Sequence, residues 1–321
     1  MTLDVFSTTL SFEEKCLTIF NYQYENCKVY QRYCNLIGVV KSSVNTVGDI
    51  PFLPIQFFKS HYINTQQGHD QIFTSSGTTG SITSKHYVSD LGIYEQSFKK
   101  AFHHFYGSVT DYCVLALLPS YLERKGSSLV YMVENLVKAS KHPKSGFYLY
   151  NHEDLYATLS ALEAQGQKTL LFGVSFALLD FIENYQMQLS HTTIMDTGGM
   201  KGRKKEITRN ELHEILMQGF GVDEIHSEYG MTELLSQAYA INGQYVCPPW
   251  MQVTTRDTED PLSKSLAYGK TGGLNIIDLA NYNSCSFIAT QDLGKVHSDG
   301  TFEVLGRFDH SDIRGCNLMA L

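Results

Sequence analysis

The chain has 321 residues, and 25 Lys and Arg against 33 Asp and Glu give a formal net charge of −8. This acidic balance argues against a protein that binds a nucleic-acid backbone, which requires a basic surface. A hydrophobic content of 43% with 18% charged residues is typical of a globular protein and excludes the disordered and fibrous classes.

Apolar runs at residues 112–119 and 170–182 are shorter than the roughly 20 residues that a bilayer span requires, so we expect no transmembrane helix. Residues 1–15 lack the basic leader and the continuous apolar core of a secretory signal, so the expected location is the cytoplasm. Seven scattered cysteines without a C-x-x-C pair fit reduced thiols, most of them small core residues, better than a disulfide framework or a zinc site.

The chain opens with predicted helices. Ser11 and Glu14 have capping-box spacing, and the residues up to 37 predict one or two amphipathic helices. Residues 50–59 contain prolines in an apolar context. They predict an ordered, partly buried connector, because proline opposes a helix and the apolar side chains oppose a solvated loop.

From residue 70 onward, short apolar runs alternate with amphipathic helical stretches, which predicts an α/β fold with largely parallel strands. The expected strands are residues 71–74, 112–118, 168–172 and 192–195, and the expected helices are residues 91–105, 127–139, 175–187 and 208–220. Later strand-like pieces between turn residues predict a smaller β-rich subdomain, at residues 244–246, 273–279, 286–290 and 300–305. We therefore expect two domains, residues 1–237 and 238–321.

Residues 74–85 (TSSGTTGSITSK) place hydroxyls and glycines directly after an expected strand and end on Lys85. Gly77 and Gly80 can turn backbone N–H groups toward an anion, and the hydroxyls donate further hydrogen bonds. The stretch has the spacing neither of a Walker A loop nor of the dinucleotide-binding glycine motif. A polyphosphate site is predicted here, with a flexible surface loop as the alternative.

This stretch resembles the phosphate-binding motif of the adenylate-forming enzymes, a superfamily that includes acyl-CoA synthetases, nonribosomal peptide adenylation domains and luciferases. Three further stretches resemble that family's motifs in the family's order, residues 196–199 (DTGG), 227–233 (SEYGMTE) and 290–294 (TQDLG). Residues 306–315 (GRFDHSDIRG) are similar to its hinge motif, although Arg314 replaces a lysine and the spacing to the last glycine is shorter. The resemblance implies the large α/β domain of the family and its use of ATP and Mg²⁺.

The resemblance implies a role for each matching residue. Those that would hold the β- and γ-phosphates are Thr74, Ser75, Ser76, Gly77, Thr78, Thr79, Gly80 and Lys85. Those that would frame the adenine are Gly198, Gly199, Tyr229 and Gly230, while Thr232 would meet the α-phosphate and Glu233 would bind Mg²⁺. Asp292 would accept hydrogen bonds from the ribose, and Arg307 would contact ribose or phosphate. Outside the family, a Gly-Gly turn, a D-L-G turn and an exposed helix carboxylate are common structural features.

One branch resembles the chain over nearly its full length, namely the acyl-protein synthetases of bacterial bioluminescence, also called long-chain-fatty-acid luciferin-component ligases. In that branch a near-terminal cysteine is acylated, which corresponds to Cys316, and Arg314 or His310 would raise its thiolate fraction. Without the resemblance, an inert thiol would be the simpler interpretation. The usual small C-terminal domain of the superfamily is expected to be missing, so the lysine with which that domain assists adenylation has no counterpart in the sequence.

The sequence therefore predicts a ligase that converts a carboxylic acid, of the fatty type, to acyl-AMP and transfers the acyl group to Cys316. The expected partners are a fatty or aryl acid and a fatty-acid reductase or acyl carrier. The alternatives are an acyl- or aryl-CoA ligase of the phenylacetate type and a non-catalytic nucleotide- or acyl-binding protein. The candidates for the wall of an acyl pocket are Phe172, Gly173, Ser175 and Phe176, with an ordinary core as the alternative. Residues 173–177 (GVSFA) approach the nucleophile elbow of serine hydrolases but lack its last glycine, which argues against a serine hydrolase.

Overall fold

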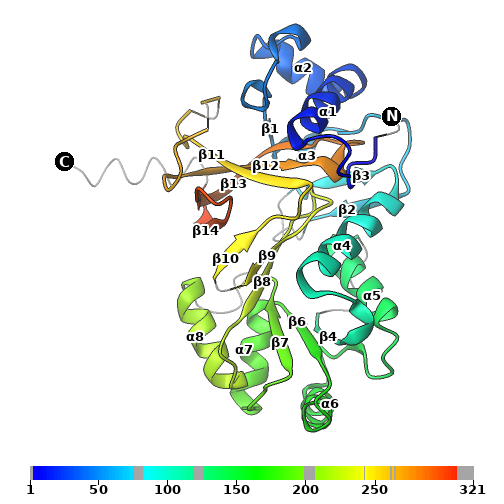
Figure 1. The fold of residues 1–321 in the computed structure, drawn as a ribbon, viewed down its shortest axis with the longest axis vertical. Coiled ribbons are helices and arrows are strands. Elements are labelled where there is room, and N and C mark those ends of the chain that lie inside the picture. The colour runs from blue at the N-terminus through cyan, green and yellow to red at the C-terminus, as the bar shows by residue number, and fades with distance from the viewer. Residues whose placement is uncertain are drawn as a thin grey trace, which may run out of the picture. The chain divides into compact units, whose positions relative to one another are not determined.

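The structure is a computed structural model, and it describes residues 3–75, 82–118, 126–198, 207–241, 243–260, 262–263 and 265–308. The chain forms two compact units (Figure 1). Unit 1 comprises Met1–Ser97, Thr232–Ser236 and Val246–Leu321, and unit 2 comprises Phe98–Met231 and Gln237–Tyr245. Both units are therefore made of separate stretches of chain, and the predicted division after residue 237 stays a prediction.

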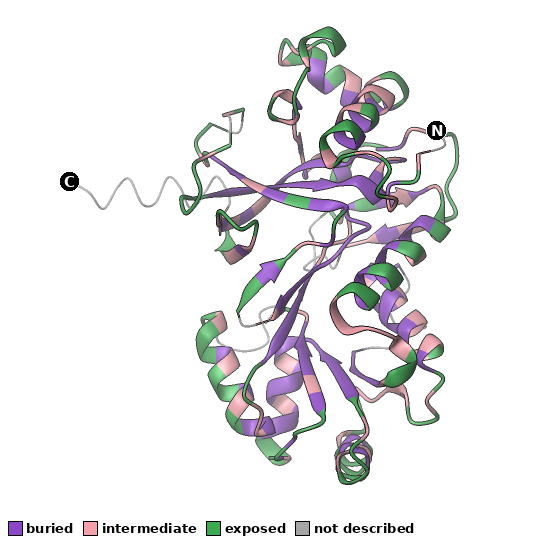
Figure 2. Cartoon of the chain, viewed as in Figure 1, coloured by how far each residue is buried: buried purple, intermediate pink, exposed green. Residues whose placement is uncertain are grey.

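The main sheet of unit 1 is antiparallel. Its strands lie in the order β11 (Met251–Arg256), β12 (Thr271–Asp278), β13 (Phe287–Val296) and β14 (Phe302–Arg307), and β1 (Leu53–Pro54) pairs in parallel with β13. Every residue of β12 after Thr271 is buried, including the polar Asn275 and Asp278, so this strand lies in the core of the sheet (Figure 2). The β-rich part that the sequence predicts near the end of the chain is thus present, although β13 extends well beyond the expected residues 286–290 and β11 was not predicted.

Two helices at the start of the chain, α1 (Phe12–Asn26) and α2 (Lys28–Leu36), pack on this sheet. The predicted capping box is present, because Ser11 Oγ accepts from the Glu14 amide and Glu14 accepts from the Ser11 amide. The Tyr30 ring stacks on Phe287 of β13 at 6.3 Å between centroids, which fixes α2 against the sheet.

The proline-containing connector is ordered, as predicted. It forms β1 and the short helix α3 (Phe57–Ser60). The Tyr30 hydroxyl donates to the carbonyl of Pro51 at 2.6 Å, and the Tyr33 hydroxyl donates to that of Phe52 at 3.0 Å. These bonds satisfy carbonyls of a segment that has little regular structure of its own.

The strand expected at residues 71–74 does not join a parallel sheet. It is β2 (Gln71–Thr74), and it pairs antiparallel with β3 (Lys85–Val88), a strand that the sequence did not predict. A hairpin can be closed by a short loop, whereas a parallel connection needs a crossover of a dozen or more residues. The glycine- and hydroxyl-rich stretch therefore joins the two strands of a hairpin.

Unit 2 contains the predicted parallel sheet. Its strands lie in the order β5 (Gly146–Phe147), β4 (Cys113–Leu117), β6 (Thr169–Gly173), β7 (Thr192–Asp196) and β8 (His226–Tyr229), followed by the antiparallel β9 (Ala238–Ile241). β10 (Gln244–Val246) is the neighbour of β9. Residues of β4 and β6 are all buried, so these strands form the centre of the sheet's core (Figure 2).

The helices of unit 2 follow its strands. They are α5 (Ser128–Ser140), α6 (His152–Ala164), α7 (Ser175–Asn184) and α8 (Arg209–Phe220), and α4 (Leu91–Tyr106) runs from unit 1 into unit 2. The second predicted capping box, of Thr208 and Glu211, begins α8. Gly219 lets α8 approach α7, because a Cβ there would lie 2.6 Å from Ile182 Cδ1. Helix α6 was not predicted, although Leu155, Leu159 and Leu162 have helical spacing.

The remaining short elements are the 3₁₀ helices η1 (Lys41–Ser43), η2 (Val47–Asp49), η3 (Val109–Asp111) and η4 (Leu279–Asn281). Among the described residues, no helix combines the length and the apolar character needed to cross a lipid bilayer.

Candidate functional site

The β2–β3 hairpin places three of the predicted phosphate-binding residues at the base of one loop. Thr74 and Lys85 are partners in the strand register. The Ser75 amide donates to the Ser84 carbonyl at 3.1 Å, and the Ser84 amide donates to Ser75 Oγ at 2.9 Å. The other predicted loop residues lie outside the described part of the chain, namely Ser76, Gly77, Thr78, Thr79 and Gly80.

The predicted metal ligand, Glu233, is a buried carboxylate with 5% exposure, and Thr232 beside it is half-buried. Burial raises the pKa of Glu233, and the nearby Asp292 raises it further, while a hydrogen bond from Ser84 and the charge of Arg307 oppose the rise. Holding a charge in this position is therefore unfavourable unless a cation compensates it.

Asp292 and Arg307 come from two different predicted motifs, and the structure brings them together. They are register partners on β13 and β14, and Arg307 Nε lies 3.2 Å from Asp292 Oδ1. Asp292 is 7% exposed, whereas the Arg307 side chain is 75% exposed. A carboxylate that is oriented by an arginine can accept hydrogen bonds from the hydroxyls of a diol.

The carboxylates of unit 1 suit a divalent ion that takes few protein ligands. Among the described residues, no group of three or more His, Cys, Asp and Glu side chains could form a metal cage. Mg²⁺ is usually held by only one or two carboxylates, with water and phosphate oxygens as the other ligands. Glu233 fits that mode, since its carboxylate oxygens are hard ligands with an unfavourable charge to compensate.

In unit 2, two predicted nucleotide-binding stretches end neighbouring strands. β7 ends at Asp196 and β8 at Tyr229, and Asp196 is paired with Ser227 in the parallel register. The carboxyl ends of parallel strands are where α/β sheets bind ligands. Gly198 has φ = +75° and donates its amide to Asp196 Oδ1 at 3.1 Å, so a glycine suits this turn. Gly199 lies outside the described residues.

The surroundings of Tyr229 include residues that the sequence did not reveal. Its ring lies 5.6 Å from that of Tyr245, and the Arg209 guanidinium lies 4.5 Å from the Tyr245 ring centroid. Arg209 also donates to Ser227 Oγ at 3.0 Å. A Cβ at Gly230 would lie 2.4 Å from Glu228 Oε1, so a larger residue there would displace the Glu228 side chain.

Glu228 is a buried carboxyl group of unit 2. Burial, and then the charge of Asp196, raises its pKa from 4.5 to about 8. The folded protein therefore keeps this proton where the unfolded chain loses it, and stability that is fully present below pH 4.5 is lost as the pH rises to about 8.

We expect Glu228→Gln, which mimics the neutral acid, to raise the free energy of unfolding at pH 8 by a few kcal/mol, at about 1.4 kcal/mol per pKa unit. Urea unfolding at pH 5, 6.5 and 8 measures the effect, and the variant should lose the downward slope of the wild type. Glu211→Gln is the control, because hydrogen bonds from Thr208 lower the pKa of that exposed carboxyl group. Parallel pH curves for wild type and Glu228→Gln would refute the shift.

The candidates for the acyl-pocket wall stay a prediction. Phe172 and Gly173 are buried in β6, and a Cβ at Gly173 would lie 2.6 Å from Leu178 Cδ2. Ser175 donates to Asp196 Oδ1 at 2.7 Å. These residues therefore also fit the alternative, an ordinary packed core.

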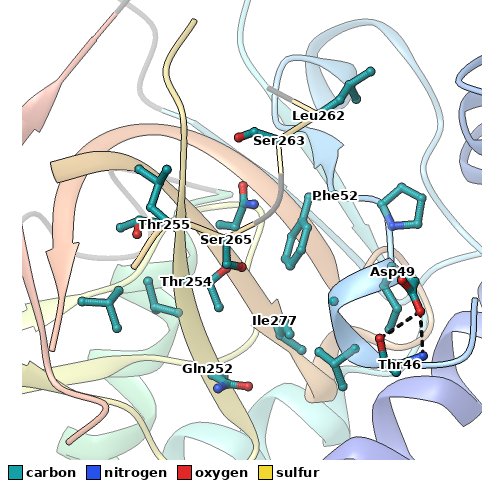
Figure 3. A pocket seen from close by; sticks show the side chains of 18 of the residues that line it. Thr46, Asp49, Phe52, Gln252, Thr254, Thr255, Leu262, Ser263, Ser265 and Ile277 are labelled. Carbon is teal, nitrogen blue, oxygen red and sulfur yellow. Dashed lines mark hydrogen bonds between the residues drawn. The ribbon is translucent and has the colours of Figure 1, made fainter. Parts of the chain in front are cut away.

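A cavity of about 860 Å³ lies within unit 1. Phe52 and Asp49 lie on one side of it and Thr254 and Ile277 of the sheet on the other, as Figure 3 shows. None of the predicted site residues that the structure describes lines it. The cavity is therefore separate from the surroundings of Glu233 and Asp292.

The cysteines of the described chain are free thiols, as predicted, and all but Cys247 are buried. Burial raises the pKa of each of them, for example to about 12 for Cys16 and Cys34. None of these six is therefore an activated nucleophile. Cys316 lies outside the described residues.

Comparison with solved structures identifies the fold. ATP-bound MatB from Rhodopseudomonas palustris is 17% identical, with 76% of this chain and 49% of that chain covered and a TM-score of 0.56. 2-Hydroxyisobutyryl-CoA ligase in the postadenylation state with 2-HIB-AMP is 11% identical, with coverages of 92% and 67% and a TM-score of 0.68. The same ligase in an open conformation with 2-HIB-AMP and CoA is 11% identical, with coverages of 96% and 74% and a TM-score of 0.67.

No protein-family model and no curated protein matches the sequence. The chain spans about half the length of MatB. At these identities the likeness concerns the fold, which is that of the N-terminal domain of adenylate-forming enzymes. The predicted fold class is confirmed.

Proposed function

We propose that the chain activates a carboxylic acid with ATP. The acid's oxygen attacks the α-phosphorus, the bond from that phosphorus to the pyrophosphate oxygen breaks, and acyl-AMP and pyrophosphate form. The observation that carries this proposal is the group of Glu233, Asp292 and Arg307 in unit 1, where three sequence motifs supply interacting charges. The fold of a ligase that binds the acyl-adenylate 2-HIB-AMP supports it.

In this proposal, the loop of residues 74–80 and Lys85 bind the β- and γ-phosphates, and Thr232 meets the α-phosphate. Tyr229 stacks on the adenine, with Gly198, Gly199 and Gly230 beside the ring. Asp292 accepts hydrogen bonds from the ribose, oriented by Arg307. Glu233 holds Mg²⁺, which supplies positive charge against the phosphates.

The acyl acceptor is proposed to be Cys316. Its thiolate attacks the acyl carbon, a thioester forms, and AMP leaves with the electron pair of the broken bond. The raised pKa values of the six described cysteines favour this choice among the chain's own thiols. A fatty acid is the proposed substrate, and a reductase or an acyl carrier would take the acyl group onward.

Acid-dependent exchange of labelled pyrophosphate into ATP tests the activation step. We expect exchange with Mg²⁺ and at least one acid from a panel of fatty and aromatic acids, and none without acid. A chain that binds ATP but exchanges no pyrophosphate with any acid would instead be a non-catalytic nucleotide-binding protein.

A second candidate is an acyl- or aryl-CoA ligase. It is favoured by the fold of 2-hydroxyisobutyryl-CoA ligase, whose structures include a complex with 2-HIB-AMP and CoA in the thioesterification state. A CoA thioester that forms at the wild-type rate in Cys316→Ser would establish this candidate, because CoA would then be the acceptor.

A further inference from the structure

Residues Thr232–Ser236 belong to unit 1, although Met231 before them and Gln237 after them belong to unit 2. This short segment has no helix or strand, yet its residues from Glu233 onward are each at most 5% exposed. Buried backbone outside regular structure must find hydrogen-bond partners elsewhere.

The partners are side chains that are distant in sequence. At the start of the segment, His86 Nδ1 lies 2.8 Å from the Thr232 carbonyl, and Asn281 Nδ2 donates to the Glu233 carbonyl at 2.8 Å. At its end, the amides of Leu235 and Ser236 donate to Asp278 Oδ2 at 2.7 and 3.0 Å. The segment is thus fastened to unit 1 on both sides of Glu233.

His86 and Asn281 form one network. Asn281 Nδ2 also donates to the Cys285 carbonyl at 2.9 Å. If the side-chain amide were flipped, Oδ1 would face the carbonyl oxygens of Glu233 and Cys285, and both hydrogen bonds would be lost. Asn281 Oδ1 therefore faces His86 Nε2, 3.0 Å away. The His86 ring is fully buried and packs edge-on against Phe58.

The strand that carries His86, β3, is preceded by a residue that contacts the carboxylate of Glu233. Ser84 precedes His86 by two residues, so both side chains lie on one face of the β3 strand and its extension. Ser84 hydrogen-bonds to the Glu233 side chain, while the network of His86 and Asn281 holds the adjoining backbone. The direction of the Glu233 carboxylate is therefore set by contacts within the protein.

We infer that His86 and Asn281 are positioning residues for the cation that accompanies ATP. They hold the carbonyls of Thr232 and Glu233, and so present the Glu233 carboxylate to the ion without touching it. This inference rests on the proposed role of Glu233 in binding Mg²⁺. Replacing a residue that orients a metal ligand through hydrogen bonds, without contacting the metal, typically lowers metal affinity about 10- to 100-fold.

Two variants test the network. Asn281→Ala removes the hydrogen bonds that Nδ2 donates to the carbonyls of Glu233 and Cys285. His86→Phe keeps an aromatic ring against Phe58 but removes the polar contacts of the imidazole. The readout is the Mg²⁺ concentration needed for half-maximal ATP binding, measured by calorimetry without any acid. We expect an increase of about tenfold or more in both variants.

Asn64→Ala is the matched control. Asn64 is another buried asparagine of unit 1, 6% exposed, and its Nδ2 donates to the carbonyls of Gly68 and Tyr87 at 3.3 and 3.1 Å. The hydrogen bonds of its side chain go to Gly68, Tyr87, Gln66 and Ser89, and not to residues 232–236. We expect a comparable loss of thermal stability but an unchanged Mg²⁺ requirement, because only the supporting role at Glu233 should affect the ion.

An unchanged Mg²⁺ requirement in folded Asn281→Ala and His86→Phe would overturn the inference, as would an equal increase in Asn64→Ala. If Asn281→Ala does not fold, His86→Phe alone decides. A wild type that binds ATP with Mg²⁺ but exchanges no pyrophosphate refutes the proposed activity and leaves this comparison intact. A wild type whose ATP binding is independent of Mg²⁺ overturns the inference.

Discussion

Replacing Glu233 by Gln is expected to reduce acid-dependent pyrophosphate exchange by at least about 100-fold. The carboxylate is the proposed ligand for the ion that stabilises charge on the phosphates, an interaction worth several kcal/mol, and about 1.4 kcal/mol corresponds to a factor of ten in rate. The measurement is the exchange rate at saturating ATP and acid over a range of Mg²⁺ concentrations.

Glu233→Gln should not lower the stability of the folded state. Burial raises the pKa of Glu233, so its ionised form opposes folding as the pH rises through the raised value. The neutral amide should therefore leave the free energy of unfolding at pH 7 equal or higher. Glu228→Gln is the control, since it neutralises another buried carboxyl group of the stretch 227–233, one to which no contact with ATP or the ion is assigned, and should retain exchange. Normal exchange in Glu233→Gln would refute the metal assignment.

The second large effect is expected at Cys316. After incubation with ATP, Mg²⁺ and the acid, the intact wild-type chain should gain the mass of one acyl group, and Cys316→Ala should gain none. The thioester cannot form without the sulfur, and the described thiols have pKa values that burial raises.

Hydroxylamine treatment checks the linkage, because it should cleave a thioester and remove the added mass. Cys247→Ala serves as the control, since Cys247 is the described cysteine that is not fully buried. An acyl increment that persists in Cys316→Ala would move the acceptor to another residue. Pyrophosphate release by the wild type without any increment would move it to CoA or a partner protein.

Much of the fold could be predicted because its signals are local. The capping boxes at Ser11 and Thr208 involve residues three positions apart, and both are present. The alternation of apolar and amphipathic stretches predicted the parallel sheet of unit 2. The hairpin of β2 and β3 was missed, because strand pairing depends on contacts that no local pattern of residues 71–74 records.

The residues of the candidate site likewise fall into those that a local motif indicates and those that only the structure reveals. Glu233 and Asp292 could be selected from the sequence because each lies in a short motif, and their roles stay predictions. Asn281 and His86 could not, because they meet across 195 residues of sequence and neither belongs to a recognisable pattern. The sequence shows Asp278 only as an acidic residue within an expected strand, and only the structure reveals the amides that it binds.

The discontinuity of unit 1 also bears on how the chain folds during synthesis. Gln23 of α1 donates to the carbonyls of Asn281 and Tyr282, and Tyr30 packs on Phe287, so the first helices need residues that are translated much later. Contacts so distant in sequence close slowly. The N-terminal helices must therefore wait with an incomplete core, while all stretches of unit 2, which lie closer together in sequence, are synthesised before the last strands of unit 1. A chaperone that shields the early apolar face of α1 and α2 should raise the yield of folded protein more than one that acts on the released chain.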